Sequence, residues 1–176
     1  MPERSAIATL SALLEESHAK PRMRIERLAP SAIYDLDYRV FVVAAAFERH
    51  AKAAPPIARR IHATRLKLLQ FIAIRPRLLP IIEEWSTAKQ DEELTFTTQD
   101  LRRGFLGDQM FDSVVAFLVA RGALEWMGTH LVEGKNAVLL SAINTAAIES
   151  GLFELERQTI DALADIKITV RMLEGE

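Results

Sequence analysis

The sequence predicts a mostly helical α+β fold: a winged helix-turn-helix-like core with a small β-hairpin or three-strand wing, and extra helices at both ends. Residues 97–128 have the pattern of a short helix, a glycine turn, a longer helix that stops at Gly122, and a strand. Residues 94–97 alternate apolar and polar side chains, which is the period of a strand. The order helix, strand, helix, helix, strand, turn, strand is that of a winged helix.

The length of 176 residues suits one hydrophobic core with a peripheral arm. Residues 1–30 are predicted to be an N-terminal helical arm and connector, and residues 31–176 a single winged-helix-like domain with a C-terminal helical extension. The arm is indicated by apolar residues three and four positions apart, which form one helix stripe: Ile7, Leu10, Leu13 and Leu14.

The first half of this domain is predicted to be helical. Ser31 is a suitable N-cap for a helix that runs to about residue 51. Pro55 and Pro56 then interrupt the chain, because the second proline lacks a backbone donor and the first is pushed out of the helical region. A further helix over 62–74 is broken at Arg75 and Pro76, and a turn or two follows to about residue 85.

The second half carries the predicted helix-turn-helix and wing. Asp108 is the expected N-cap of its second helix. The predicted elements are helices over 98–105 and 108–121, a hairpin that pairs 124–127 with 137–140 across a turn at 133–136, and a helical end over 141–176. Within that end, the expected stripe is Leu152, Leu155, Thr159, Ile160 and Leu163.

The composition indicates a globular cytoplasmic protein. Hydrophobic residues make up 49% of the chain and charged residues 26%, which is typical of folded soluble proteins. The absence of cysteine excludes disulfides and thiolate chemistry and agrees with a reducing compartment. Residues 1–20 lack the apolar core of a signal peptide, and the longest apolar run, 40–47, is shorter than the roughly 20 residues that a bilayer requires.

The net charge of −2 hides an uneven distribution. Residues 49–82 carry eight lysines or arginines and no acidic residue, whereas residues 83–93 and the chain after residue 148 are acidic. On one face these cations could neutralise several phosphates; they could also pair with the acidic loop or acidic C-terminal helix, or bind an acidic partner. With two arginines of the helix that follows, the candidate contact residues are Arg59, Arg60, Arg65, Lys67, Arg75, Arg77, Arg102 and Arg103.

The predicted recognition helix over 108–121 is poorly suited to read DNA. Gln109 and Arg121 are its only side chains of the kind that bind base edges or phosphates, while Asp108 and Asp112 would repel phosphate. Most of its other positions are apolar, as in a core helix. The sequence therefore favours a helix-turn-helix that serves as a scaffold, with any nucleic-acid contact made by the basic helices before it.

Enzymatic signals are weak. The sequence holds neither a phosphate-binding Gly-x-x-x-x-Gly-Lys-Ser/Thr loop nor a Gly-x-Ser-x-Gly nucleophile elbow. Its four histidines, His18, His50, His62 and His130, are far apart in the sequence and form no i, i+4 pair. We therefore expect a non-catalytic protein without cofactor, bound metal or small-molecule substrate.

Three segments resemble the middle component of bacterial three-component ABC-ATPase defence systems of the Lamassu type. They are PPIARRIHATRLKLLQFIAIRPRLL (55–79), DQMFDSVVAFLVARGALEW (108–126) and ALADIKITVRMLEG (162–175). The first is similar to the family's Pro-Ile, Leu-x-x-Leu and apolar-Arg/Ser-Pro segment. The second is like its helix that ends in a Gly-Leu strand, and the third is like its closing Lys-x-Thr helix start.

The resemblance implies a non-catalytic winged-helix subunit that bridges an SMC- or Rad50-like ATPase and an effector, often a nuclease, in anti-phage or anti-plasmid defence. The partners would be these two proteins, with DNA reached through the complex. The alternative is a winged-helix DNA-binding transcriptional regulator that uses the candidate cations on phosphates.

Overall fold

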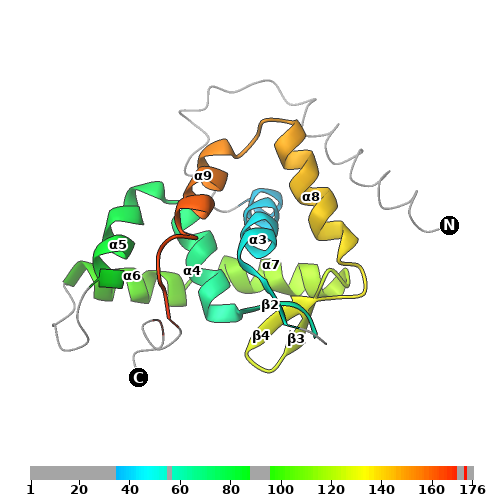
Figure 1. Ribbon diagram of the computed structural model, residues 1–176, viewed down its shortest axis with the longest axis horizontal. Helices are drawn as coiled ribbons and strands as arrows, with labels where there is room; N and C mark the ends of the chain where they lie inside the picture. Colours follow the sequence, from blue (N-terminus) through cyan, green and yellow to red (C-terminus); the bar gives the residue numbers. More distant parts are fainter. Residues whose placement is uncertain (1–34, 55–56, 88–95, 170–172, 174–176) are drawn as a thin grey trace. The chain divides into compact units, whose positions relative to one another are not determined.

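Helix α3 (Leu36–His50) lies at the centre of the part of the chain that the computed structural model describes, which is residues 35–54, 57–87, 96–169 and 173. It packs against α4 (Ala63–Ala73), α7 (Gln109–Ala120), α8 (Val138–Glu149) and α9 (Glu154–Ala162), as Figure 1 shows. Because neighbours surround it, most of its side chains are buried. The apolar run that the sequence places in this helix therefore forms the middle of the core.

Helix α3 begins at a side-chain cap. The Asp35 carboxylate accepts hydrogen bonds from the backbone N–H groups of Asp37, at 2.9 Å, and Tyr38, at 3.2 Å. These bonds satisfy two of the donors that a helix start leaves unpaired. The predicted cap, Ser31, lies outside the described residues. Asp35 is instead the N-cap, and the helix begins at Leu36.

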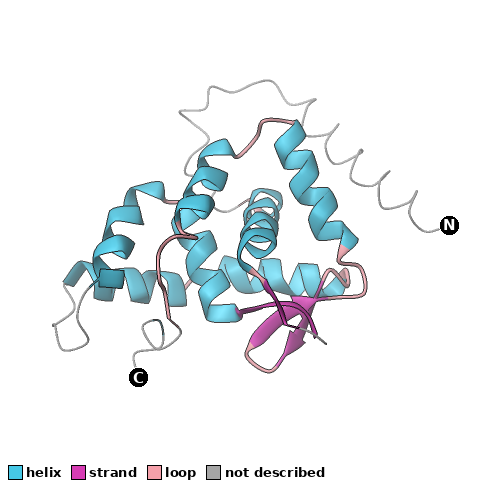
Figure 2. Ribbon diagram, in the orientation of Figure 1, coloured by secondary structure: helices cyan, strands magenta, loops and turns pink. Residues whose placement is uncertain are grey.

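A four-stranded antiparallel sheet lies at one end of the helices, as Figure 2 shows. Its strand order is β1 (Lys52–Ala54), β2 (Ile57–His62), β4 (His130–Glu133) and β3 (Leu124–Met127). Ile61 pairs with Leu131, and Leu131 with Trp126. Ile61, Leu131 and Leu124 are buried, so this face of the sheet covers the helical core.

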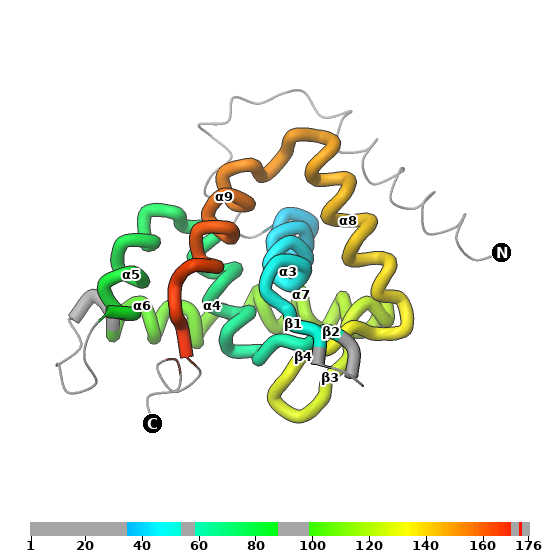
Figure 3. The backbone as a smooth tube through the Cα atoms, in the orientation of Figure 1, coloured from blue at the N-terminus to red at the C-terminus, as the bar shows by residue number. Residues whose placement is uncertain are grey.

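The other helical elements complete the described chain, and the tube in Figure 3 follows their path. They are the 3₁₀ helix η2 (Pro76–Leu78), α5 (Leu79–Thr87) and α6 (Phe96–Leu106). The predicted helix over 62–74 corresponds to α4, and those over 98–105 and 108–121 to α6 and α7. Mostly helical residues with a small antiparallel sheet confirm the predicted α+β class. The winged-helix assignment within that class stays a prediction, as does the division of the chain at residue 30.

The predicted hairpin is wrong in its second strand. Residues 124–127 pair with 130–133 across a turn at Gly128 and Thr129, and residues 138–140 are the first turn of α8. Gly128 has a φ of 61°, which the first position of a two-residue type II′ turn requires. The run of four apolar residues at 137–140 fits a buried strand or a helix equally well, so the local pattern could not decide between them.

The third strand beside the hairpin also comes from a different segment. Strand β2, at residues 57–62, pairs with β4. The strand predicted at residues 94–97 is wrong for its last two residues, because α6 starts at Phe96. Residues 94 and 95 lie outside the described ranges. The sequence IARRIH hides its strand character because two arginines occupy its middle and two prolines precede it.

Glycine is required where α7 passes into the hairpin. Gly122 ends α7 with a φ of 69°, a left-handed conformation that glycine adopts without strain. A Cβ at Gly134 would lie 2.3 Å from the carbonyl oxygen of Gly122. The two glycines therefore let the backbone before β3 and the backbone after β4 approach each other closely.

The predicted apolar stripe of the C-terminal helix is only partly correct. Thr159, Ile160 and Leu163 are buried, but Leu152 and Leu155 are 39% and 58% exposed. Helix α9 starts at Glu154, after Phe153 in the left-handed region with a φ of 60°. The chain thus turns between α8 and α9, and Leu152 precedes the helix instead of lying on its inner face.

Two polar contacts connect the end of α3 to α9. The Arg49 Nε donates to the Asp161 carboxylate at 2.6 Å, and His50 Nε2 lies 2.9 Å from the carbonyl oxygen of Ile160. Burial lowers the pKa of His50. One basic residue of the central segment therefore pairs with the acidic C-terminal helix, which is one of the alternatives that the sequence left open.

No single helix in the described residues is long and apolar enough to cross a membrane. Helices α8 and α9 pass that test only when they are taken together, as a pair bent by 118°.

A buried ion pair joins the central helix to the start of α7. The Arg39 guanidinium, 1% exposed, donates from Nη2 to the carboxylate of Asp108, 10% exposed. The amide of Gln70, on α4, donates to the same carboxylate at 2.9 Å. Burial would raise the pKa of Asp108, but the hydrogen bonds from Arg39 and Gln70 outweigh it and lower this pKa. One carboxylate therefore connects three helices.

We predict that Asp108→Asn lowers the free energy of unfolding at pH 7 by about 3–5 kcal/mol, because it leaves the Arg39 charge buried without its partner. The folded-state pKa of Asp108 is depressed, so its contribution is present above the ordinary carboxyl value of 3.8 and is lost as the pH falls through the lower folded value. Urea denaturation between pH 7 and pH 3 would measure both effects.

Asp112→Asn is the matched control, since Asp112 is an exposed residue of the same helix whose ion pair is worth about 1 kcal/mol or less. A variant at Asp108 that is no less stable than this control would contradict the role of the buried pair.

Candidate interaction surface

Arg59 is turned to the core side of β2 and is held by two carboxylates. Its Nη2 lies 2.8 Å from Oε1 of Glu48, on α3, and 2.7 Å from Oε1 of Glu133, on β4. Its Nε donates to Glu133 at 2.8 Å. The hydrogen bond to Glu133 is the main cause that raises the pKa of Arg59. This candidate contact residue therefore connects the sheet to the central helix.

Lys67 and Arg65, on α4, also bond within the protein. The Lys67 ammonium lies 3.2 Å from both carboxylate oxygens of Asp112 and 5.6 Å from the centre of the Phe111 ring. Half-buried Arg65 donates to the carbonyl oxygen of Ile168 at 3.3 Å, and burial lowers its pKa. These two cations are thus used in packing α4 against α7 and against the segment after α9.

The candidate cations of η2 and its flank differ in exposure. The Arg75 guanidinium lies 4.0 Å from the centre of the Phe71 ring and donates to the Phe71 carbonyl oxygen at 3.4 Å. Arg77 is exposed. Stacking on a ring covers one face of the guanidinium, so Arg75 offers less of its surface to a ligand than Arg77 does.

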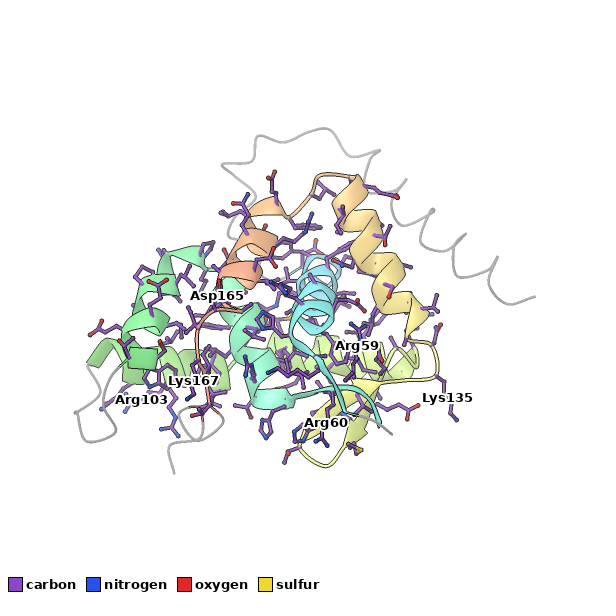
Figure 4. All side chains as sticks on the ribbon, viewed as in Figure 1. Arg59, Arg60, Arg103, Lys135, Asp165 and Lys167 are labelled. Atoms are coloured by element: carbon purple, nitrogen blue, oxygen red, sulfur yellow. The ribbon has the colours of Figure 1, made fainter. Side chains whose placement is uncertain are left out.

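Arg60, Arg102 and Arg103 are the remaining candidates, and they are not brought together. Arg103 is 78% exposed on α6, with the carboxylate of Asp100 at 4.0 Å, and Arg102 is partly exposed beside it. Arg60 lies in the sheet, on β2, and Figure 4 shows it on the opposite side of α4 from Arg103. The structure therefore divides the eight candidate cations between internal bonds and separate parts of the surface.

The second face of the sheet is turned away from Ile61, Leu131 and Leu124, and we call it the outward face, although Val132 in its middle is buried. The register places Arg60, Val132 and Glu125 in one cross-strand row, and His62, His130 and Met127 in the next. Directly paired residues of antiparallel strands lie on the same face. We call the second set the outward row. Sequence reasoning missed it because His62 and His130 are 68 positions apart and only the β2–β4 pairing makes them neighbours.

The two histidines of the outward row are in direct contact. Their ring centres lie 5.1 Å apart with an interplanar angle of 82°. The hydroxyl of Thr129 lies 3.3 Å from Nδ1 of His130. Burial, the neighbouring His62 and the positive charge of Arg60 all lower the pKa of His130. These surroundings therefore favour the neutral form of the His130 imidazole.

Strand β3 is one edge of the sheet and carries two exposed apolar side chains. Trp126 is 54% exposed and Met127 is 36% exposed. Trp126 lies on the core-side face, paired with buried Leu131, but at the rim where the helices do not cover it. We call these two residues and the free side of the strand the β3 edge. Exposed tryptophan and methionine are enriched where proteins bind other proteins.

The outward side of α7 offers small and polar groups. Its exposed residues are Gln109, Asp112, Ser113, Ala116 and Ala120. The expectation that Asp108 would repel phosphate from this helix is wrong, because Asp108 points inward to Arg39. Asp112 is exposed and is contacted by Lys67. The helix therefore still lacks the cations that a DNA-reading helix usually presents.

In the ranges that the structure describes, no three His, Asp or Glu side chains are grouped in a way that would hold a metal ion. Comparison with protein-family models, with curated proteins and with solved structures found no match to this chain.

We predict that Arg59→Ala lowers the free energy of unfolding by about 1–2 kcal/mol, because it leaves Glu48 and Glu133 close together without the cation between them. Arg77→Ala, which removes an exposed arginine, should change stability by less than about 0.5 kcal/mol. Chemical denaturation of both variants would separate the two roles. Equal stability of the two variants would mean that Arg59 is not a structural residue.

Proposed function

We propose that this chain is a non-catalytic adaptor subunit of a cytoplasmic multi-protein complex, and that it binds a protein partner through the β3 edge. The observation that carries the proposal is the exposed Trp126, beside exposed Met127, on an edge strand. Edge strands present unpaired backbone groups to other chains, and aromatic side chains are enriched at protein interfaces, so this edge is suited to bind another protein.

The internal use of the basic segment supports this choice. Arg59, Arg65 and Lys67, which the sequence offered as phosphate contacts, bond to Glu48, Glu133, Asp112 and the Ile168 carbonyl. Phosphate binding depends on several cations that act together, and these three already have partners. An interface built on apolar contact at the β3 edge needs none of them.

The Lamassu-type resemblance of the sequence suggests the partners. In that arrangement the chain would bridge an SMC- or Rad50-like ATPase and an effector, often a nuclease, in defence against phages or plasmids. The ATPase would supply the nucleotide-binding motif that this sequence lacks. DNA would be reached through the complex.

A winged-helix DNA-binding regulator is the second candidate, and the outward face of the sheet favours it. Lys52 pairs with Arg60 across β1 and β2, so two cations lie together near His62 and His130. Phosphate contacts by this face would make DNA affinity fall steeply as salt is added. A mobility shift of the full-length chain that is absent, or that does not weaken with salt, would exclude this candidate.

We predict that Trp126→Ala weakens binding to the partner by about 30-fold, since a buried interface tryptophan is commonly worth 2 kcal/mol or more. The measurement is co-purification of the tagged full-length chain with the products of adjacent genes, followed by titration of the partner that is recovered. Because Trp126 is exposed, the variant should keep the stability of the unsubstituted chain to within about 0.5 kcal/mol.

Leu155→Ala is the matched control, because Leu155 is an equally exposed apolar residue on α9, away from the sheet. It should leave partner binding unchanged. If no adjacent gene product is recovered, and the chain remains a stable monomer, the adaptor function is refuted. If Leu155→Ala abolishes partner binding and Trp126→Ala leaves it unchanged, the interface does not lie at the β3 edge.

A further inference from the structure

The outward row gathers three metal-ligating side chains on one surface. His62 pairs with His130, and His130 pairs with Met127, so that one side chain comes from each of three strands. The imidazole rings are 5.1 Å apart, which is close enough for both to reach one ion through their nitrogens. Both histidines are partly exposed and Met127 is 36% exposed. The row is therefore reached from solution at its Met127 side, whereas Nδ1 of His62 is itself buried.

The backbone under the row is well fixed. The Ala63 N–H, at the start of α4, donates to the Thr129 carbonyl oxygen at 3.0 Å. This bond joins the turn between β3 and β4 to the residue after His62. His62 is the N-cap residue of α4. The three side chains are thus held on a rigid part of the sheet, as a binding site requires.

The chemistry of the three groups selects a class of ion. A thioether is a soft ligand that prefers Cu(I) and its relatives, and imidazole is compatible with such ions. Ca²⁺ and Mg²⁺ instead require several oxygen ligands, and no third His, Asp or Glu joins the two histidines in the described ranges. We propose that His62, His130 and Met127 bind a soft monovalent cation of the Cu(I) or Ag(I) class.

The charges nearby are mixed in sign. Arg60 and Glu125 both lie on the same face in the adjacent row, two residues from His62 and from Met127 along their strands, so their opposite charges offset each other at the site. The start of α4 at His62 adds the positive end of a helix dipole, which repels a divalent ion more than a monovalent one. At the roughly 7 Å between alternate residues of a strand, removing the Arg60 charge should tighten binding of a monovalent ion about two- to threefold.

The test is titration of the full-length chain with silver nitrate in halide-free buffer, followed by NMR of the histidine rings and methionine methyl groups. We expect the signals of His62, His130 and Met127 to shift together at one equivalent. His50, buried and bonded to the Ile160 carbonyl, should not shift in that step. Absence of site-specific shifts at the three residues would overturn the proposal.

Variants test the role of each group. His130→Gln should abolish the silver-induced shifts at His62, and Met127→Leu, an exposed substitution that conserves volume, should weaken silver binding without changing the fold. Two results together would refute the thioether ligand. One is Zn(II) binding as tightly as silver, and the other is a silver affinity of Met127→Leu equal to that of the unsubstituted chain. Arg60→Gln removes a positive charge beside the site and so tests whether the site binds a cation. Tighter silver binding by this variant supports the proposal, whereas weaker silver binding contradicts it.

Discussion

The ion pair between Arg39 and Asp108 is the constraint on which the arrangement of the helices depends. Arg39 lies within the apolar central helix, and Asp108 is the residue from which α7 starts. Apolar helix faces can pack in several rotations with similar energy, whereas a buried charge is tolerated only where its partner meets it. With Gln70 bonded to the same carboxylate, α3, α4 and α7 are held in one register. The hairpin follows α7 directly, so its position depends on the same pair.

The charge asymmetry of the sequence has a structural explanation in these internal pairs. The basic segment, residues 49–82, contains no acidic residue of its own, but the fold brings Glu48, Asp112, Glu133 and Asp161 to its side chains. Each pair joins segments that are separate in the chain. A cluster of cations in a sequence therefore does not by itself indicate a nucleic-acid surface, because the fold can distribute and neutralise it.

The sequence predicts the helices well because their signals are local. Gly122 ends α7 where expected, and the apolar run of α3 is central to the core. The strands are harder, since β2 is short and arginine-rich and its partner β4 lies about 70 residues later. The same long-range pairing creates the contact between His62 and His130. Among the candidate cations, a local pattern likewise could not distinguish inward Arg59 from outward Arg60, because that difference depends on which face of β2 meets α3.

The two proposed binding features use opposite faces of the same edge strand, since successive residues of a strand point to opposite sides. Trp126 belongs to the core-side face and Met127 to the outward face. A partner that covers Trp126 on the core-side face would leave the two histidines accessible, because both lie on the opposite face of the sheet. Met127 is the only residue shared by the β3 edge and the outward row. Coupling between partner binding and ion binding would therefore have to pass through its flexible side chain, and Met127→Leu is the substitution that would reveal it.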